Sequence, residues 1–330
     1  MGSTSRTDLP QEQREALRAA VRWEWATIGF TACTITIVAF VVGNSQAMKT
    51  AWIEDMLSVI PQFAFLVALI FIRRAPTRMF PFGLHRVMGV GHLVAGVALL
   101  AVGGHLAVES LLGLVNAEHP TIGSVQLFGT TIWQGWLMIA VMAVIVVGPL
   151  VYGRAKSRLA PKLHNKLLAA DADMAKADWQ TNAASILGVL GIGVGFWWLD
   201  GVAALFISVG IVWDGIKNTR SSVRGLIDEQ ARTHDDQEPH PLMERVILHL
   251  HAQSWVDEVG VRMRDQGQVF HVEAFVVPID RRPPTVDALQ DVERDLARLD
   301  WKMQDVVLVP VASIPDEAQT LASLRGGGRT

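Results

Sequence analysis

Acidic side chains stand inside two stretches of the sequence that are otherwise apolar. Glu54 and Asp55 lie near the start of the first stretch, and Asp171 and Asp178 lie in the second. A charge inside an apolar helix is costly, so it usually faces a polar cavity or a partner. Carboxylates that meet from two helices supply the negative charge that a divalent cation needs, and they release protons as the metal binds.

The second stretch gathers several polar groups on one helical face. At about 100° per residue, the side chains of Asp171, Met174, Asp178 and Asn182 lie within about 80° of one another. Asp173 and Lys176 point the other way. We therefore predict a metal site between two helices. Its candidate residues are Asp55, Asp178, Glu54, Asn182, Asp171 and Met174. Four alternatives stay open: Asp178 as a polar packing residue, Glu54 as an acid near the interface that reaches water, Asp171 as an acid of a cytoplasmic vestibule, and Met174 as core filler.

These acids depend on helices that are long enough to cross a bilayer. A hydrocarbon core of about 30 Å needs about 20 apolar helical residues. Six stretches reach that length, and they are residues 23–43, 50–72, 87–115, 127–152, 167–197 and 199–220. The sequence thus predicts an all-α membrane domain of six transmembrane helices, with both termini on one side.

Basic residues indicate which side that is. Arginines and lysines precede the first stretch and join the second to the third and the fourth to the fifth, whereas the opposite connections hold only Lys49. Positive residues concentrate in cytoplasmic loops. We expect a multi-pass protein of the cytoplasmic membrane with both termini in the cytoplasm.

The last hundred residues are predicted to form a second, cytosolic domain. Their pattern of helix, strand, strand, helix and strand favours a small α+β fold of the ferredoxin or metallochaperone type, with one antiparallel sheet and helices on one face. The predicted divisions are a cytosolic tail at 1–22, the transmembrane domain at 23–222, a linker at 223–240, a dimerisation domain at 241–313 and a flexible tail at 314–330.

Composition excludes several other classes. Hydrophobic residues make up 50% of the 330 positions and charged residues only 18%, which is too apolar for one soluble core. The net charge of −3 gives no footprint for nucleic acid. A single cysteine, Cys33, allows neither a disulfide framework nor a thiolate metal cluster within the chain.

Three segments carry a resemblance to the cation diffusion facilitator family. FPFGLHRV at 80–87 resembles the family's aromatic-Pro-Phe-Gly segment before the third span, DWQTN at 178–182 is similar to its Asp-x-x-x-Asn on the fifth span, and LDGVAALFISVGIVWDGIKNTRSSVRGLID at 199–228 looks like its sixth span. The resemblance implies a homodimer paired through its C-terminal domains. It also implies metal-for-proton exchange by alternating access, with no tightly bound cofactor.

The sequence departs from the family's ligand pattern of His or Asp followed by Asp four residues later. On the second span the pair becomes Asp55 and Val59, and on the fifth it becomes Met174 and Asp178. A site without histidine or cysteine favours oxygen ligation, hence Mn²⁺ or Fe²⁺ over a dedicated Zn²⁺ site, with Co²⁺ and Ni²⁺ as further candidates.

The resulting hypothesis is efflux of a divalent transition-metal ion by proton antiport. The incomplete ligand pattern motivates one rival, a member of the family that no longer transports and acts as a membrane scaffold or metal sensor. An enzyme has little support, since the sequence shows no pairing of nucleophile with base and no phosphate-binding glycine loop.

Overall fold

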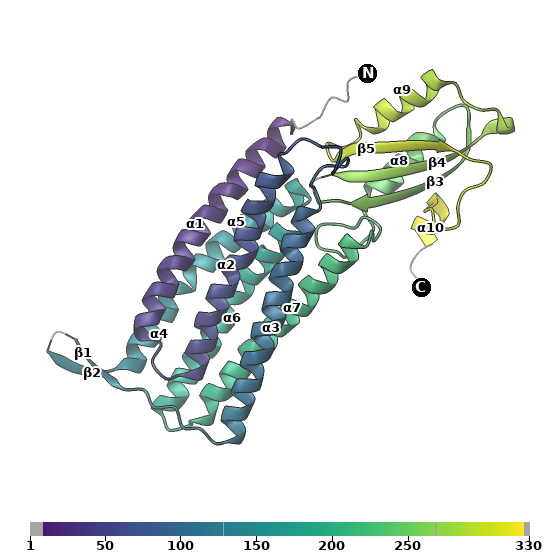
Figure 1. Cartoon of the computed structure of the whole chain (residues 1–330). Coiled ribbons are helices and arrows are strands. Elements are labelled where there is room, and N and C mark those ends of the chain that lie inside the picture. Colours follow the sequence, from purple (N-terminus) through teal and green to yellow (C-terminus); the bar gives the residue numbers. More distant parts are fainter. Residues whose placement is uncertain (1–8, 128, 268, 327–330) are drawn as a thin grey trace.

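The molecule consists of a long helical bundle and a small sheet domain at one end of it (Figure 1). The computed structural model describes residues 9–127, 129–267 and 269–326. The first helix starts at the end of the bundle that carries the sheet domain (Figure 1). The described ends of the chain therefore lie on the same side of the bundle.

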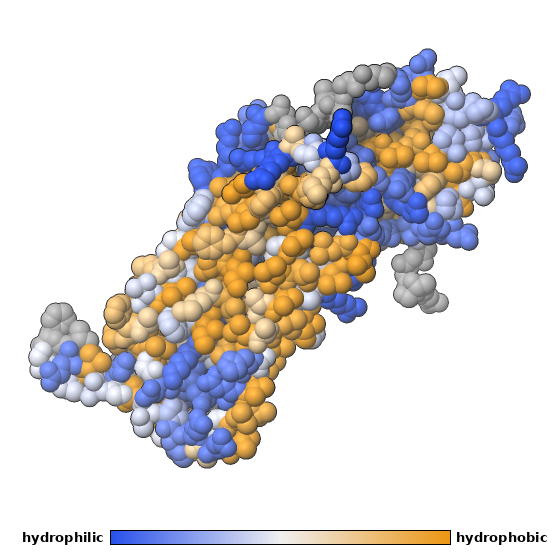
Figure 2. All heavy atoms as spheres, viewed as in Figure 1, coloured by the Kyte–Doolittle hydropathy of each residue, from blue (hydrophilic) through white to orange (hydrophobic). Residues whose placement is uncertain are grey.

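Seven helices form the bundle among the described residues. They are α1 (Gln11–Val41), α2 (Gln46–Ile72), α3 (Val87–Val115), α4 (Gln134–Ile145), α5 (Val147–Leu163), α6 (Lys166–Gly193) and α7 (Trp198–Leu226). In this part of the chain, five segments are long and apolar enough to cross a membrane, namely α1, α2, α3, α7 and the pair α4 and α5 taken together. The charged helix α6 packs against α2, α5 and α7. Figure 2 shows an apolar surface along the bundle, with hydrophilic residues at both ends.

The region around the fourth apolar stretch differs from the prediction. Residues expected to begin a span at 127 instead belong to a hairpin of β1 (Ser124–Leu127) and β2 (Thr130–Trp133), at the end of the bundle away from the sheet domain (Figure 1). The run 130–133 is β-branched or aromatic, which favours a strand. The helix then continues past the predicted end at 152 to Leu163, with a break at Val146. Pro149 explains the break, because it lacks the N–H that would bond one turn back.

The longer α5 places basic residues on a helix that were predicted in a loop. Arg154, Lys156 and Arg158 all lie on α5, and only His164 and Asn165 join it to α6. Asn165 caps α6, because its side-chain oxygen accepts a hydrogen bond from the Leu168 N–H at 2.9 Å. Lys156 consequently lies inside the protein and not at its surface.

The sheet domain has the predicted order of elements but a different sheet. It comprises α8 (Leu242–His251), β3 (Val256–Asp265), β4 (Phe270–Pro278), the 3₁₀ turn η1 (Ile279–Arg281), α9 (Val286–Leu296), β5 (Met303–Pro310) and α10 (Leu321–Gly326). Strands β3 and β4 are antiparallel, whereas β4 and β5 are parallel, so the prediction of a wholly antiparallel sheet is wrong. The chain crosses through α9 between β4 and β5, and such a crossover returns a strand in the same direction.

Apolar residues of α8, α9 and the sheet share one core. Val246 and Leu250 of α8 and Leu296 of α9 are buried against Val261 and Val272 of the sheet. The segment predicted as a flexible tail also contacts this domain. Residues 261 and 319 exchange two backbone hydrogen bonds of 2.9 Å.

The start of α2 is fixed by a buried acid on α7. Asp200 is fully buried, and its carboxylate accepts hydrogen bonds from the Ser45 hydroxyl at 2.6 Å and from the backbone N–H groups of Gln46 at 2.6 Å and Ala47 at 3.3 Å. An acid at a helix N-terminus satisfies free N–H groups and complements the helix dipole. Asp200 thereby sets the position of the helix that carries Glu54 and Asp55.

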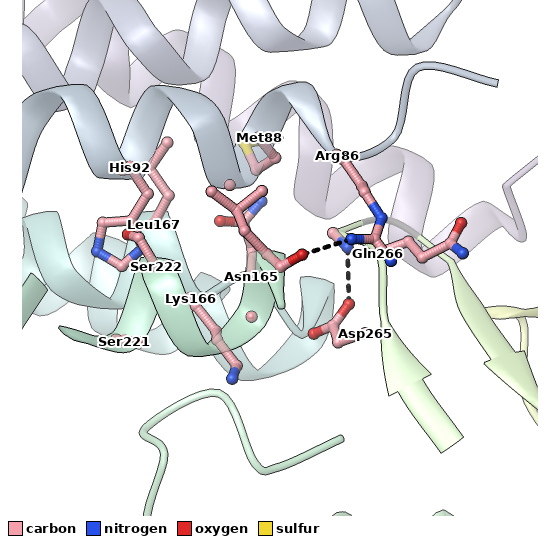
Figure 3. Close-up of a pocket in the computed structure, with 14 residues that line it drawn as sticks. Arg86, Met88, His92, Asn165, Lys166, Leu167, Ser221, Ser222, Asp265 and Gln266 are labelled. Carbon is pink, nitrogen blue, oxygen red and sulfur yellow. Dashed lines mark hydrogen bonds between the residues drawn. The ribbon is translucent and has the colours of Figure 1, made fainter. Parts of the chain in front are cut away.

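The bundle and the sheet domain meet at a cavity of about 60 Å³, which is lined by residues of both, among them Arg86 and Asp265 (Figure 3). Ion pairs also join the two parts. Arg86, at the start of α3, donates to the Leu226 carbonyl at 2.7 Å and pairs with Asp228. Asp228 also binds Arg264 of β3 at 2.9 Å. One carboxylate after α7 thus connects an arginine of the bundle with an arginine of the sheet.

A pair of histidines lies at the same junction. His240 Nε2 is 3.3 Å from His164 Nδ1, while the Leu242 N–H donates to His240 Nδ1 at 3.3 Å. Because Nδ1 of His240 is an acceptor, Nε2 carries the proton and donates to His164. Burial, with His164 and the Lys302 ammonium nearby, lowers the pKa of His240 to about 4. The pKa of His164 is also lowered, chiefly by burial.

We predict that acid weakens this junction through His240. The lowered pKa means that the unfolded chain binds the proton first, so the stabilisation is complete above about pH 6.5 and is lost as the pH falls toward 4. His240→Asn should unfold at a lower temperature than the native chain at pH 7 but lose less stability between pH 7 and pH 5. Thermal unfolding of the full chain in detergent measures both.

The exposed His251 provides the control, because His251→Asn should keep the native pH dependence. A His240→Asn variant with the full native loss between pH 7 and pH 5 would show that the histidine pair does not carry the effect.

Candidate cation site

The acids singled out by the sequence lie on neighbouring helices. Glu54 and Asp55 are on α2 and Asp178 is on α6, and these two helices pack against each other. All three side chains are partly buried. Asp178 lies close enough to interact electrostatically with both Asp55 and Glu54. Two helices therefore bring three carboxyl groups into one region of the bundle.

Two buried oxygen atoms in this region have no hydrogen-bond partner. They are Oε2 of Glu54 and Oδ1 of Asn182. The Asn182 amide nitrogen donates to the Asp178 backbone carbonyl at 2.7 Å, which directs its oxygen away from that bond. Buried acceptors are costly when they are unpaired. A cation bound beside either atom would satisfy it.

Two further residues belong to this region that the sequence did not single out. The Tyr152 hydroxyl of α5 donates to Asp178 Oδ2 at 3.5 Å. Asp214 of α7 interacts electrostatically with both Glu54 and Asp178. The signals were present, since Tyr152 is the single tyrosine of the chain and Asp214 is an acid inside an apolar span.

Asp171 has a different partner from the one predicted. Its carboxylate accepts a hydrogen bond from the buried Lys156 ammonium at 2.5 Å. An ammonium at this distance occupies the position that a metal ion would take. Asp171 therefore lies outside the cation site that we derive from the structure.

Met174 packs into an apolar cluster. It is buried, and its cluster includes Leu57 of α2 and Leu99 of α3. This packing supports the alternative that Met174 fills space in the core, because a thioether among aliphatic side chains can do so without binding a metal ion.

The site is not a preformed cage. Among the described residues, there is no group of three or more His, Cys, Asp or Glu side chains arranged to hold a metal ion. The donor set that remains is two or three carboxylates and one amide oxygen. Such a set of donors suits a cation that keeps part of its water shell and is bound only transiently.

Comparison with known proteins identifies the class of this molecule. A model of the cation efflux transmembrane domain matches residues 25–227, which is more than half of the chain. The chain belongs to the cation efflux family, whose members transport metal cations, and the resemblance seen in the sequence is confirmed. Its apolar helices and this membership make it a multi-pass membrane protein.

A curated relative covers most of the chain. The chain is similar to the uncharacterized transporter YdbO of Bacillus subtilis (strain 168), with 24% identity over 298 residues. The match spans 87% of this chain and 93% of that protein. The similarity therefore includes the sheet domain as well as the bundle.

The packing of Met174 leads to a prediction. Met174→Leu conserves volume and polarity, so it should change stability by less than about 1.5 kcal/mol. It should also leave the affinities for Mn²⁺ and for the softer ion Cd²⁺ within about twofold, since no ligand is lost. Isothermal titration of the full chain in detergent measures both affinities. A selective loss of Cd²⁺ affinity would instead identify the sulfur as a ligand.

Proposed function

We propose that this protein exports a divalent transition-metal ion from the cytoplasm in exchange for protons. The metal ion is the substrate, and it binds between α2 and α6 to Asp55 and Asp178, with Glu54 and the amide oxygen of Asn182 as additional donors. The observation that carries the proposal is the pair of unpartnered buried oxygens beside these acids. Carboxylates in this position must bind either a cation or protons, and the exchange of one for the other is antiport.

The donor set bears on the choice of ion. All donors are oxygen atoms, which suits Mn²⁺ and Fe²⁺ better than it suits a dedicated Zn²⁺ site. Zn²⁺, Co²⁺ and Ni²⁺ remain within the proposed substrate class, since ions of this series compete for the same kinds of donor.

Six membrane crossings are part of the proposal. Helix α6 is 28 residues long and packs among the apolar helices, although its first half is charged. The N-terminal helix and the sheet domain lie at the same end of the bundle, as an even number of crossings requires (Figure 1). Arg73 and Arg74 lie near that end of the bundle. Their positive charge supports placing this end in the cytoplasm and the bundle in the cell membrane.

A homodimer is also part of the proposal. His105 and Glu109 lie 3.8 Å apart on α3, and their side chains are 75% and 63% exposed in a single chain. Exposed apolar residues such as Val108 and Leu112 surround them. An ionisable pair facing lipid is costly. A second copy of the chain would cover it.

The rival function is a membrane scaffold or metal sensor without transport. Its support is the lack of a preformed three-ligand group among the described side chains. Titration of the purified chain with first-row divalent ions separates the two. Saturable binding in the micromolar range supports the exporter, and its absence for every ion supports the rival.

We predict that Asp178→Asn abolishes exchange while the protein stays folded. Asparagine keeps the size of the side chain but can neither carry the proton nor supply the negative charge. Mn²⁺-driven proton movement in proteoliposomes should fall by at least about 100-fold.

The matched control is Asp173→Asn on the same helix. Asp173 is exposed, lies 3.9 Å from Lys217 and is not one of the proposed ligands. Its variant should transport at the native rate. Native flux in Asp178→Asn would remove Asp178 from the mechanism.

A further inference from the structure

A buried lysine joins three helices in the half of the bundle near the sheet domain. Lys156 of α5 is fully buried, and its ammonium donates to Glu24 of α1 at 3.0 Å and to Asp171 of α6 at 2.5 Å. The side chains of Glu24 and Asp171 are 1% and 7% exposed. We call these three residues the lysine triad. None of them belongs to the cation site proposed above.

The charges of the lysine triad do not balance. One ammonium faces two carboxylates, so the fully ionised triad keeps a net negative charge in a region closed to water. An uncompensated buried charge is strongly destabilising. A single added proton, held by one carboxyl group, makes the triad neutral while both hydrogen bonds to Lys156 remain possible.

Among the described side chains, the other titratable groups that interact with the triad or with Tyr152 supply no positive charge. The Lys156 ammonium lies over the ring of Tyr152 on α5. Tyr152 in turn interacts with Asp178 on α6 and Asp55 on α2. The acids among them add negative charge, which favours the protonated triad further.

Tyr152 connects the triad with the cation site. It lies one turn before Lys156 on α5, its ring centroid is 5.5 Å from the Lys156 ammonium, and its hydroxyl donates to Asp178. Asp171 and Asp178 are seven residues apart on α6, or about 10.5 Å along one helical face. Polar groups thus continue from the cation site to the triad.

We propose that Glu24, Lys156 and Asp171 form a proton-binding site, distinct from the metal ligands, that exchanges its proton as the cation binds. This role in exchange rests on the proposed function. The arriving cation replaces protons at Asp55 and Asp178, and its field favours the ionised triad. The O–H bond of the protonated carboxyl group then breaks, its electron pair stays on the carboxylate, and the proton passes to water at the cytosolic end.

Two measurements on the full chain in detergent test the proposal. The first is infrared spectroscopy of the metal-free protein, where a protonated carboxyl group has its own carbonyl band. The native chain at pH 7 should show a band that both Glu24→Gln and Asp171→Asn reduce by about one carboxyl group, while the protonated carboxyl groups of Asp55 and Asp178 keep their share of the signal. The second is the number of protons released per Mn²⁺ bound, followed with a pH indicator in weak buffer.

Glu24→Gln should release about one proton fewer than the native chain, while the Mn²⁺ affinity stays within about fivefold because no ligand is removed. The matched control is Glu12→Gln. Glu12 also pairs a lysine of α5, Lys162, at 3.1 Å, but this pair is exposed, so both native results should be retained.

A native proton count in Glu24→Gln would overturn the role of the triad in exchange. An infrared band unchanged in both Glu24→Gln and Asp171→Asn would show that the triad holds no proton. If the native chain bound none of the first-row divalent ions, the proposed function would fail, whereas the infrared measurement would still decide whether the triad is a proton site.

Discussion

Carboxylates inside the helical bundle require a positive charge, and this requirement organises most of the molecule. The bundle meets it in two ways. Around Lys156 the compensating cation is part of the chain, and it holds α1, α5 and α6 together. Around Asp55 and Asp178 the described side chains provide no such cation, and nearby oxygens of Glu54 and Asn182 are unpartnered. The first arrangement fixes a structure, and the second leaves room for a substrate.

The remaining contacts position these two clusters. Asp200 fixes the start of α2 through three hydrogen bonds, so the acids of α2 face α6 in a defined register. The short connection between α5 and α6 keeps those helices adjacent and places Tyr152 beside Asp178. At the other end, Asp228 links the bundle to the sheet domain. A change in the sheet domain can therefore act directly on the ends of α3 and α7.

Hydropathy and residue spacing predicted the apolar helices, the acids between them and the order of elements in the second domain. The failures have physical causes. The positive charges on α5 indicated a loop at the membrane surface. The sequence gives no sign that Glu24 and Asp171, which are distant in the chain, pair with Lys156 inside the bundle. For the same reason the sequence could not show that Asp171, a predicted metal ligand, accepts a hydrogen bond from Lys156. The parallel pairing of β5 depends on the crossover through α9, which a pattern of alternating residues does not report. Met174 matched a ligand position in spacing, but the spacing could not show that Leu57 and Leu99 surround it.

The central claim is that acids from α2 and α6 bind one cation between them. Anomalous diffraction from crystals soaked in Mn²⁺ tests it most directly, because the signal locates the ion independently of the protein atoms. The account predicts one peak per chain, bounded by carboxylate oxygens of Asp55 and Asp178. Density held only by other residues, or none between these helices at saturating Mn²⁺, would contradict it.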